Sequence, residues 1–256
     1  MKPTPPQTVH LADKPGAWVD LALTLPIFIG YQVGVVFLKV KNASDLVTGP
    51  LLALANGNRA MYLGMTLSLG VVFTGVFSLM GRGHAFRLGK FVQIAVEGAI
   101  YAVVMRLGAD FVVGRLSIGP RTLHTGAAPV LGADPVTGVV MSLGAGFYEE
   151  LAFRVILFGI GAKVLVWLFA RERVSLVGQG PRLTLTAFVV VVAWALAASA
   201  VFSVAHYLGL FGDRFELGSF VFRLILGLAL TLIFTLRGFA AAVWAHALYD
   251  VWVLVL

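Results

Sequence analysis

Long runs of apolar residues recur along the chain from residue 21 to the C-terminus, separated by short polar stretches. A run of about 17 to 25 apolar residues has the length that a helix needs to cross the hydrocarbon core of a membrane. Strand-length segments of alternating polarity, which outer-membrane barrels need, do not recur. The pattern predicts an all-α fold, a polytopic transmembrane helical bundle of about seven spans. We place the spans near residues 21–38, 60–80, 91–110, 138–170, 183–206, 219–236 and 239–256.

The fourth run, 138–170, is too long for one simple crossing, because its helix would be roughly 50 Å long at a rise of about 1.5 Å per residue. We expect either one protruding or bent helix or two short ones. Loop charge favours a single crossing with the N-terminus in the cytoplasm. That arrangement leaves nine Lys and Arg residues on the inner side and six in the outer loops, which is the expected direction of bias.

The chain divides into a polar N-terminal tail, residues 1–20, and a single transmembrane domain, residues 21–256. No convincing small-residue cleavage site follows the first apolar run, so we interpret that run as an uncleaved span. The long connection from Phe111 to Thr137 is rich in Gly and Pro and can fold over the mouth of the bundle.

Composition supports a membrane protein and narrows its chemistry. Hydrophobic residues make up 59% of the chain and charged residues 12%, and the mean hydropathy is +0.94, which excludes both a water-soluble globular protein and a disordered one. The net charge is +7, and the basic residues lie in short stretches between apolar runs. The orientation of the spans in the membrane explains this basic excess, and no nucleic-acid partner is expected. The absence of cysteine excludes disulfides, zinc-thiolate sites, iron–sulfur clusters and thiol nucleophiles. Carboxylates, imidazoles and hydroxyls must supply the chemistry.

The fourth span contains two adjacent carboxylates, Glu149 and Glu150, followed by Arg154. Charged side chains inside a span are costly unless they are paired or face a wet cavity, so they indicate function. Residues four apart share a helix face, which predicts an ion pair between Glu150 and Arg154 while Glu149 projects elsewhere. One carboxylate is thereby neutralised, and the other is left free to act as a general base and acid.

Two histidines lie within or at the end of predicted spans. His206 ends the fifth span, four residues after Phe202, and His246 lies in the seventh span, four residues before Asp250. In the proposed topology Glu149 and His246 lie at similar depths, about 15 to 16 Å below the outer ends of their helices. We therefore expect Glu149, His206, His246 and Asp250 to meet in the outer half of the bundle.

These motifs resemble the CPBP intramembrane proteases, also called the Abi or CAAX-protease family. The family pattern is EExxxR, FxxxH and HxxxN or HxxxD on successive membrane helices. Here it reads Glu149 to Arg154, Phe202 to His206 and His246 to Asp250. The resemblance covers roughly residues 138–256.

The resemblance implies hydrolysis of a peptide bond by a water molecule held in the membrane. By similarity, Glu149 would activate the water with help from His206, and His246 with Asp250 would bind the developing oxyanion. Glu150, Arg154 and Phe202 would give structural support. The implied partners are a membrane-associated protein or peptide substrate and the lipid bilayer, and the implied location is a bacterial inner (plasma) membrane.

Two points of mechanism stay open at this stage. CAAX-type relatives carry Asn at the last motif position, whereas Asp250 is a donor only when protonated, so an ionised Asp250 would orient or charge His246 instead. The sequence lacks the His-Glu-x-x-His helix of zinc proteases, and we expect no cofactor and no metal. Zinc is the alternative, and its ligands would be Glu149, His206 and His246.

Two other functions compete with proteolysis. A catalytically silent family member would act as a membrane scaffold or immunity factor, with the polar network merely organising the bundle. A transporter or proton pathway would use the other charges in or near spans, but Glu97, Arg106, Lys163 and Arg223 share no spacing. Among substrates, bacteriocin leaders, C-terminal sorting tails and prenylated tails all remain open.

Overall fold

The computed structural model describes residues 17–38, 42, 45, 47–80, 89–116, 134–173, 183–208 and 212–255. Within these ranges the chain is helical, without strands. The helices are α1 (Ala17–Leu38), α2 (Thr48–Leu54), α3 (Arg59–Met80), α4 (Gly89–Leu116), α5 (Pro135–Gly144), the π-helical segments η1 (Ala145–Glu149) and η2 (Leu151–Ile160), α6 (Gly161–Ala170), α7 (Leu185–Ala205), α8 (Leu217–Arg237) and α9 (Phe239–Val255). The all-α prediction is confirmed for the described residues.

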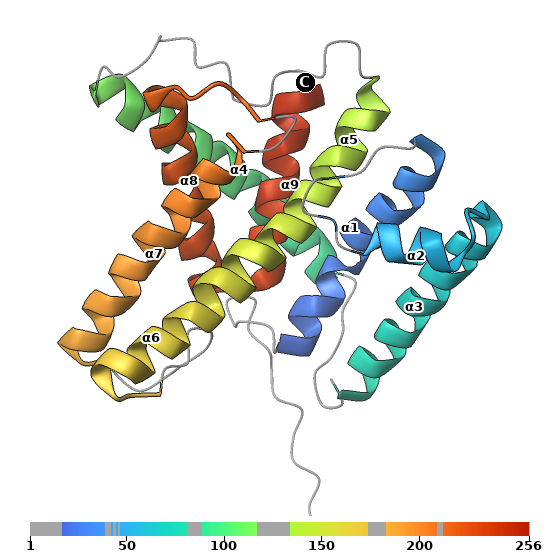
Figure 1. Cartoon of the computed structure of the whole chain (residues 1–256), viewed down its shortest axis with the longest axis horizontal. Coiled ribbons are helices and arrows are strands. Elements are labelled where there is room, and N and C mark those ends of the chain that lie inside the picture. Colours follow the sequence, from blue (N-terminus) through green and yellow to red (C-terminus); the bar gives the residue numbers. More distant parts are fainter. Residues whose placement is uncertain are drawn as a thin grey trace, which may run out of the picture.

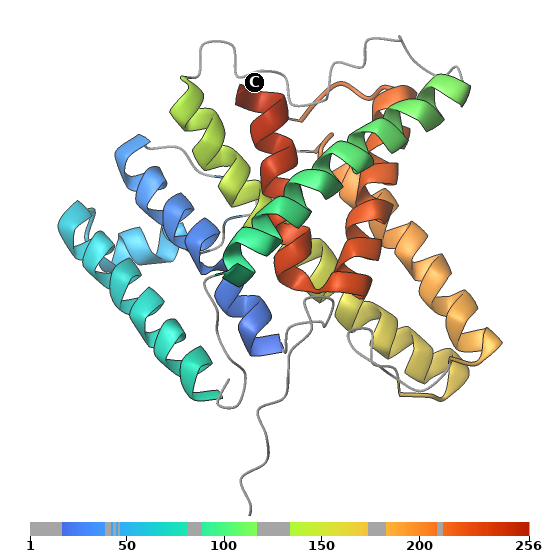
Figure 2. The same cartoon turned by 180° about the vertical axis from the view of Figure 1, so that it is seen from behind.

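Five of the described helical stretches are long and apolar enough to cross a membrane, which indicates an integral membrane protein. They are Val19–Leu38, Gly89–Leu116, Pro135–Ala170, Leu185–Ala205 and Leu217–Arg237. The apolar parts of the other two predicted spans are shorter, Arg59–Phe73 and Phe239–Val255, so their crossing stays a prediction. The long helices run alternately up and down through the bundle (Figures 1 and 2).

The fourth predicted span is one continuous helical stretch of 36 residues, Pro135–Ala170, not two helices. The side chain of Asp134 caps its start by accepting a hydrogen bond from the Thr137 N–H at 2.9 Å, and Pro135 occupies the first turn. Its middle winds as the π-helical segments η1 and η2, on either side of Glu150. Such π-helical turns are rare and occur frequently at functional sites.

The helices differ from the sequence prediction in three places. Helix α1 begins at Ala17, before the predicted start of the first span at residue 21. Helix α4 continues to Leu116, past the predicted start of the connection at Phe111, and in this extension the Arg115 guanidinium lies 5.0 Å from the centre of the Phe111 ring one turn away. The rest of that connection, 117–133, lies outside the described residues, as do residues 1–16 of the predicted tail. Helix α2 was not predicted, because at 7 residues it is far shorter than a span.

Helix α9 lies at the centre of the bundle, against α1, α4, α5 and α8 (Figure 2). Alanines make this close packing feasible, and Ala240, Ala241, Ala242 and Ala245 are fully buried. The Asp20 carboxylate of α1 accepts hydrogen bonds from the N–H groups of Phe239 and Ala240 at 2.5 and 2.9 Å, which caps the first turn of α9.

Helix α1 packs closely on α5 through glycines. A side chain at Gly34 would overlap Val140, and one at Gly30 would lie 3.1 Å from Leu143. This pair of small residues is one turn apart and lets the two backbones approach. The Tyr31 ring of α1 also lies against Gly144, the last residue of α5 before η1. Helix α1 is thus fixed against the irregular middle of the long helix.

Candidate active site

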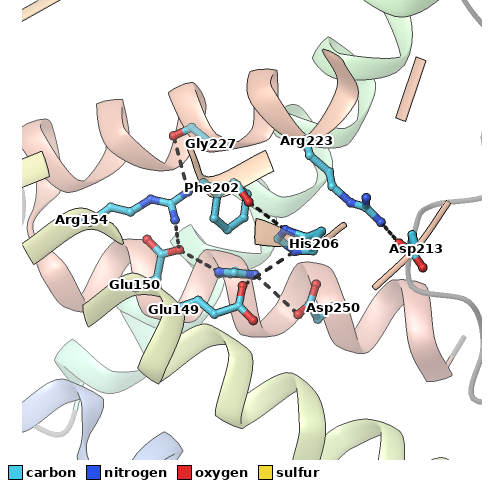
Figure 3. A network of polar contacts seen from close by, with 10 residues as sticks. Glu149, Glu150, Arg154, Phe202, His206, Asp213, Arg223, Gly227 and Asp250 are labelled. Carbon is cyan, nitrogen blue, oxygen red and sulfur yellow. Dashed lines mark hydrogen bonds and ion pairs between the residues drawn. The ribbon is translucent and has the colours of Figure 1, made fainter. Parts of the chain in front are cut away.

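The adjacent glutamates of the long helix point in different directions, as the sequence predicts (Figure 3). Glu150 is fully buried. Glu149 ends η1 and lines a cavity. Its Oε2 atom is buried, and within the described residues it has no hydrogen-bond partner. Glu149 is therefore the carboxylate that can interact with a molecule entering the cavity.

Glu150 connects two helices through one oxygen atom. Its Oε1 lies 3.1 Å from Arg154 Nη1, which confirms the predicted ion pair, and 2.7 Å from Nδ1 of His246 on α9. Arg154 is itself 1% exposed; it donates to the Gly227 carbonyl at 3.5 Å, and its guanidinium lies 4.2 Å from the centre of the Phe202 ring. The sequence did not predict the contact between Glu150 and His246, which are 96 residues apart.

His206 follows the last turn of α7, and its ring is oriented by its own helix. Its Nδ1 lies 2.9 Å from the carbonyl oxygen of Phe202. Because a carbonyl oxygen can only accept, Nδ1 must carry a proton, and in the neutral ring Nε2 is then an acceptor. Nε2 faces Glu149 Oε2 at 3.9 Å. The four-residue spacing of Phe202 and His206 thus fixes the tautomer as well as the ring position.

His246 lies between two carboxylates. In addition to the Glu150 contact at Nδ1, its Nε2 lies 3.5 Å from Asp250 Oδ2, one turn further along α9. This separation is too long for a good hydrogen bond, so Nε2 keeps access to the cavity. The ring centres of Phe202 and His246 are 6.0 Å apart. Phe202 therefore packs between Arg154, His206 and His246 as an apolar spacer.

The four residues predicted to meet do line one cavity, with a volume of about 190 Å³. Its other lining residues are mostly apolar: Met105, Phe202, Phe222, Arg223, Leu226, Leu230, Tyr249 and Val253. Helices α4, α7, α8 and α9 and the long helix all contribute. A small, largely apolar cavity with a few convergent polar groups is typical of an active or binding site.

Arg223, which the sequence analysis named only for the transporter alternative, is a cavity residue. It is 5% exposed, forms an ion pair with Asp213 and lies 5.1 Å from the centre of the Tyr207 ring. The Asp213 N–H donates to the His206 carbonyl at 3.0 Å, so the pair also ties the segment before α8 to the end of α7 (Figure 3). Its position inside an apolar span marked Arg223 in the sequence, but no spacing connected it to His206.

The other charges of the transporter alternative lie away from the cavity. Glu97 forms a bidentate ion pair with Arg237 at 2.8 and 3.0 Å, and Arg106 pairs with Asp110 along α4. Lys163 is exposed on α6. Of the four residues of that alternative, Arg223 alone lines the cavity.

The arrangement around Glu149 can be compared with what a metal needs. Across the part of the chain that the structure describes, no group of three His, Cys, Asp or Glu side chains is arranged to hold a metal ion. His246 Nδ1 contacts Glu150 at 2.7 Å, whereas Nε2 lies 3.5 Å from Asp250 and keeps access to the cavity. The zinc set of Glu149, His206 and His246 stays an alternative.

Together these features define a polytopic helical membrane protein with a cavity in which carboxylates and imidazoles converge. Residues 132–252 match the family described as type II CAAX prenyl endopeptidase Rce1-like. The chain therefore contains a domain of the Rce1-like CAAX protease (CPBP) family, a family of intramembrane proteases. The predicted resemblance is confirmed, and helices α1 to α4 precede the matched segment. No curated protein and no solved structure matches the chain significantly.

Proposed function

We propose that the protein is an intramembrane endopeptidase in which Glu149 activates a water molecule for attack on a peptide bond. The observation that carries the proposal is the free Oε2 atom of Glu149, 3.9 Å from Nε2 of His206 in a shared cavity. Two acceptors at this separation can both accept a hydrogen bond from one water molecule. Such a water would be oriented and made more nucleophilic by both groups.

In the proposed step, the water oxygen attacks the carbonyl carbon and its proton passes to Glu149 or His206. The same group then returns the proton to the amide nitrogen as the carbon–nitrogen bond breaks. The products are one new carboxyl terminus and one new amino terminus. Because Nδ1 of His206 is held by the Phe202 carbonyl, Nε2 is the nitrogen available for this transfer.

The developing oxyanion needs a donor on the cavity wall, and we assign this role to Nε2 of His246. Glu150 accepts from Nδ1 at 2.7 Å, and Asp250 lies 3.5 Å from Nε2. Two flanking carboxylates favour a ring with protons on both nitrogens. Asp250 then orients and charges His246 and is not itself the donor. Glu150 and Arg154 give structural support by linking the long helix to α9 and α8.

We propose that the reaction needs no metal and no other cofactor. The arrangement of the described side chains supports this assignment, because no three His, Cys, Asp or Glu side chains among them are placed to hold a metal ion together. A strong chelator should leave the activity of the purified protein within about twofold. Loss of activity with a chelator, restored by added zinc, would overturn the assignment and return Glu149, His206 and His246 to the role of ligands.

The proposed substrate is a membrane-associated or exported protein, and we place the cavity in the outer half of a bacterial inner membrane. This placement depends on the cytoplasmic N-terminus inferred from loop charge. A reporter that is active only in the periplasm, fused to Leu256, should be active. An inactive reporter would indicate the opposite orientation. A cytoplasmic prenylated tail would then fit as substrate better than a sorting tail or a bacteriocin leader.

The experiment that tests the proposal compares peptide termini in membranes and medium from cells that carry different variants at matched expression. Cells with the native protein should show termini that are missing with Glu149→Gln. The matched control is Glu172→Gln, the same change at a residue in the segment after α6, away from the cavity. Identical termini in all cells, together with a phenotype on deletion, would support the silent scaffold or immunity factor instead.

A further inference from the structure

A buried polar cluster joins the helices before the matched family segment to the long helix. Gln32 of α1 is fully buried. Its amide nitrogen donates to the Tyr148 hydroxyl at 2.5 Å, and its amide oxygen accepts from the hydroxyls of Thr48, at 3.2 Å, and Tyr62. The cluster therefore links α1, α2 and α3 to the residue directly before Glu149.

A second set of contacts, around Tyr31 and Asp45, adjoins this cluster. The Tyr31 hydroxyl donates to Asp45 at 2.8 Å, and the Tyr31 and Tyr148 rings meet edge to face with centres 5.5 Å apart. Asp45 also accepts from the N–H groups of Val47 and Thr48 at the start of α2. Buried polar groups are costly unless each finds a partner, so a connected set of this kind holds its members in one arrangement.

The contacts converge on η1, the π-helical turn Ala145–Glu149. On one side, the Tyr31 ring fills the space beside Gly144. On the other side, a side chain at Gly146 would lie 2.7 Å from the Ala247 Cβ and 2.9 Å from the Val243 carbonyl of α9. The turn is therefore held between α1 and α9, and π-helical turns of this kind are rare and occur frequently at functional sites.

The last two side chains of this turn and the next one, Glu150, point in three directions. Tyr148 is held by Gln32, Glu149 lines the cavity, and Glu150 is held by Arg154 and His246. We propose that the contact between Gln32 and Tyr148 positions Glu149 for catalysis, so that α1 to α3 act as a positioning unit for the family domain. This inference rests on the proposed endopeptidase function.

The expected effect follows from how tightly reacting groups must be placed. Glu149 and His206 are 3.9 Å apart, so a water molecule that contacts both has little room for further displacement. A misplacement of about 1 Å can cost about a hundredfold in rate. Removing the Tyr148 hydroxyl leaves its ring packed on Tyr31 and Phe147. The displacement of Glu149 should therefore be smaller than about 1 Å. We expect a fall in kcat of about tenfold, with KM within about twofold.

The test compares Tyr148→Phe, Gln32→Leu and the double variant with native protein, reconstituted in lipid. If the contact between Gln32 and Tyr148 alone lowers kcat, the kcat of the double variant should lie within about twofold of that of the slower single variant. If the two residues act independently, the two losses in kcat should multiply. Hydrogen exchange at residues 144–150 should become several-fold faster in each variant, and this readout does not depend on activity.

The matched control is Asp20→Asn, which weakens another buried contact of α1, the cap of α9. It should lower the melting temperature but change neither kcat nor exchange at 144–150. Unchanged kcat and exchange in folded Tyr148→Phe, or an equal loss in Asp20→Asn, would overturn the inference. If Gln32→Leu does not fold, Tyr148→Phe alone decides. Native protein without peptidase activity would instead refute the proposed function, and hydrogen exchange would still decide whether the contact holds the turn.

Discussion

Replacing Glu150 by alanine should cost far more stability than replacing an exposed carboxylate. Arg154 is 1% exposed, and the Glu150 carboxylate at 3.1 Å is its ion-pair partner. Without that carboxylate, the guanidinium would keep the Gly227 carbonyl at 3.5 Å and the Phe202 ring at 4.2 Å. Neither contact neutralises a buried charge, so we expect a loss of about 3–5 kcal/mol in the free energy of unfolding.

A double variant separates stability from function. Glu150→Leu together with Arg154→Met removes both charges and keeps apolar volume in the core, and such replacements of buried pairs are often neutral or stabilising. It should recover most of the stability lost in Glu150→Ala. Activity should stay lost in both variants, because His246 no longer has the partner that holds Nδ1 at 2.7 Å.

The assay is reversible unfolding in mixed micelles, titrated with a denaturing detergent and followed by helical circular dichroism. The matched control is Glu172→Gln, which should change the free energy of unfolding by less than about 0.5 kcal/mol. A loss below about 1 kcal/mol in Glu150→Ala, or a double variant as unstable as the single one, would refute the reasoning about the buried charge.

Three further predictions follow from the same contacts. Asp250→Asn should keep kcat within about tenfold of native, because an amide can still orient His246; a loss of about a hundredfold or more would make Asp250 essential to oxyanion binding. Gly146→Val should lower the free energy of unfolding by about 1–3 kcal/mol or more, since its Cβ would lie 2.8 Å from the Ala247 backbone nitrogen; an unchanged detergent-unfolding midpoint would contradict the close packing. Arg237→Gln should cost about 1 kcal/mol by the same assay, because its ion pair with Glu97 is partly exposed, and kcat should not change; a slower enzyme would mean that this pair is coupled to the cavity.

The spans and the local pairs could be predicted from the sequence for physical reasons. Membrane thickness sets the length of an apolar helix, so five of the spans were recognisable from run length alone. Helix geometry places residues four apart on one face, so the pairs Glu150–Arg154 and His246–Asp250 were recognisable from spacing.

Contacts between distant segments could not be predicted in this way. The bond from Gln32 to Tyr148 joins residues 116 apart, and no spacing rule connects them. The ion pair of Arg223 with Asp213 could not be predicted either, because Asp213 lies in the irregular segment before α8, where no helical spacing applies. The π-helical turns also lack a sequence pattern, since apolar runs look alike in α and π geometry.

Within the described residues, Glu149 Oε2 has no hydrogen-bond partner and lies beside His206, and we propose that Glu149 activates the water that cleaves a peptide bond. The most direct test of this proposal is turnover of a library of membrane-derived peptides by purified protein in liposomes, native or Glu149→Gln, with product termini identified by mass spectrometry. We expect specific new termini with native protein and none with a Glu149→Gln variant of unchanged melting temperature. The same termini from both proteins would contradict it.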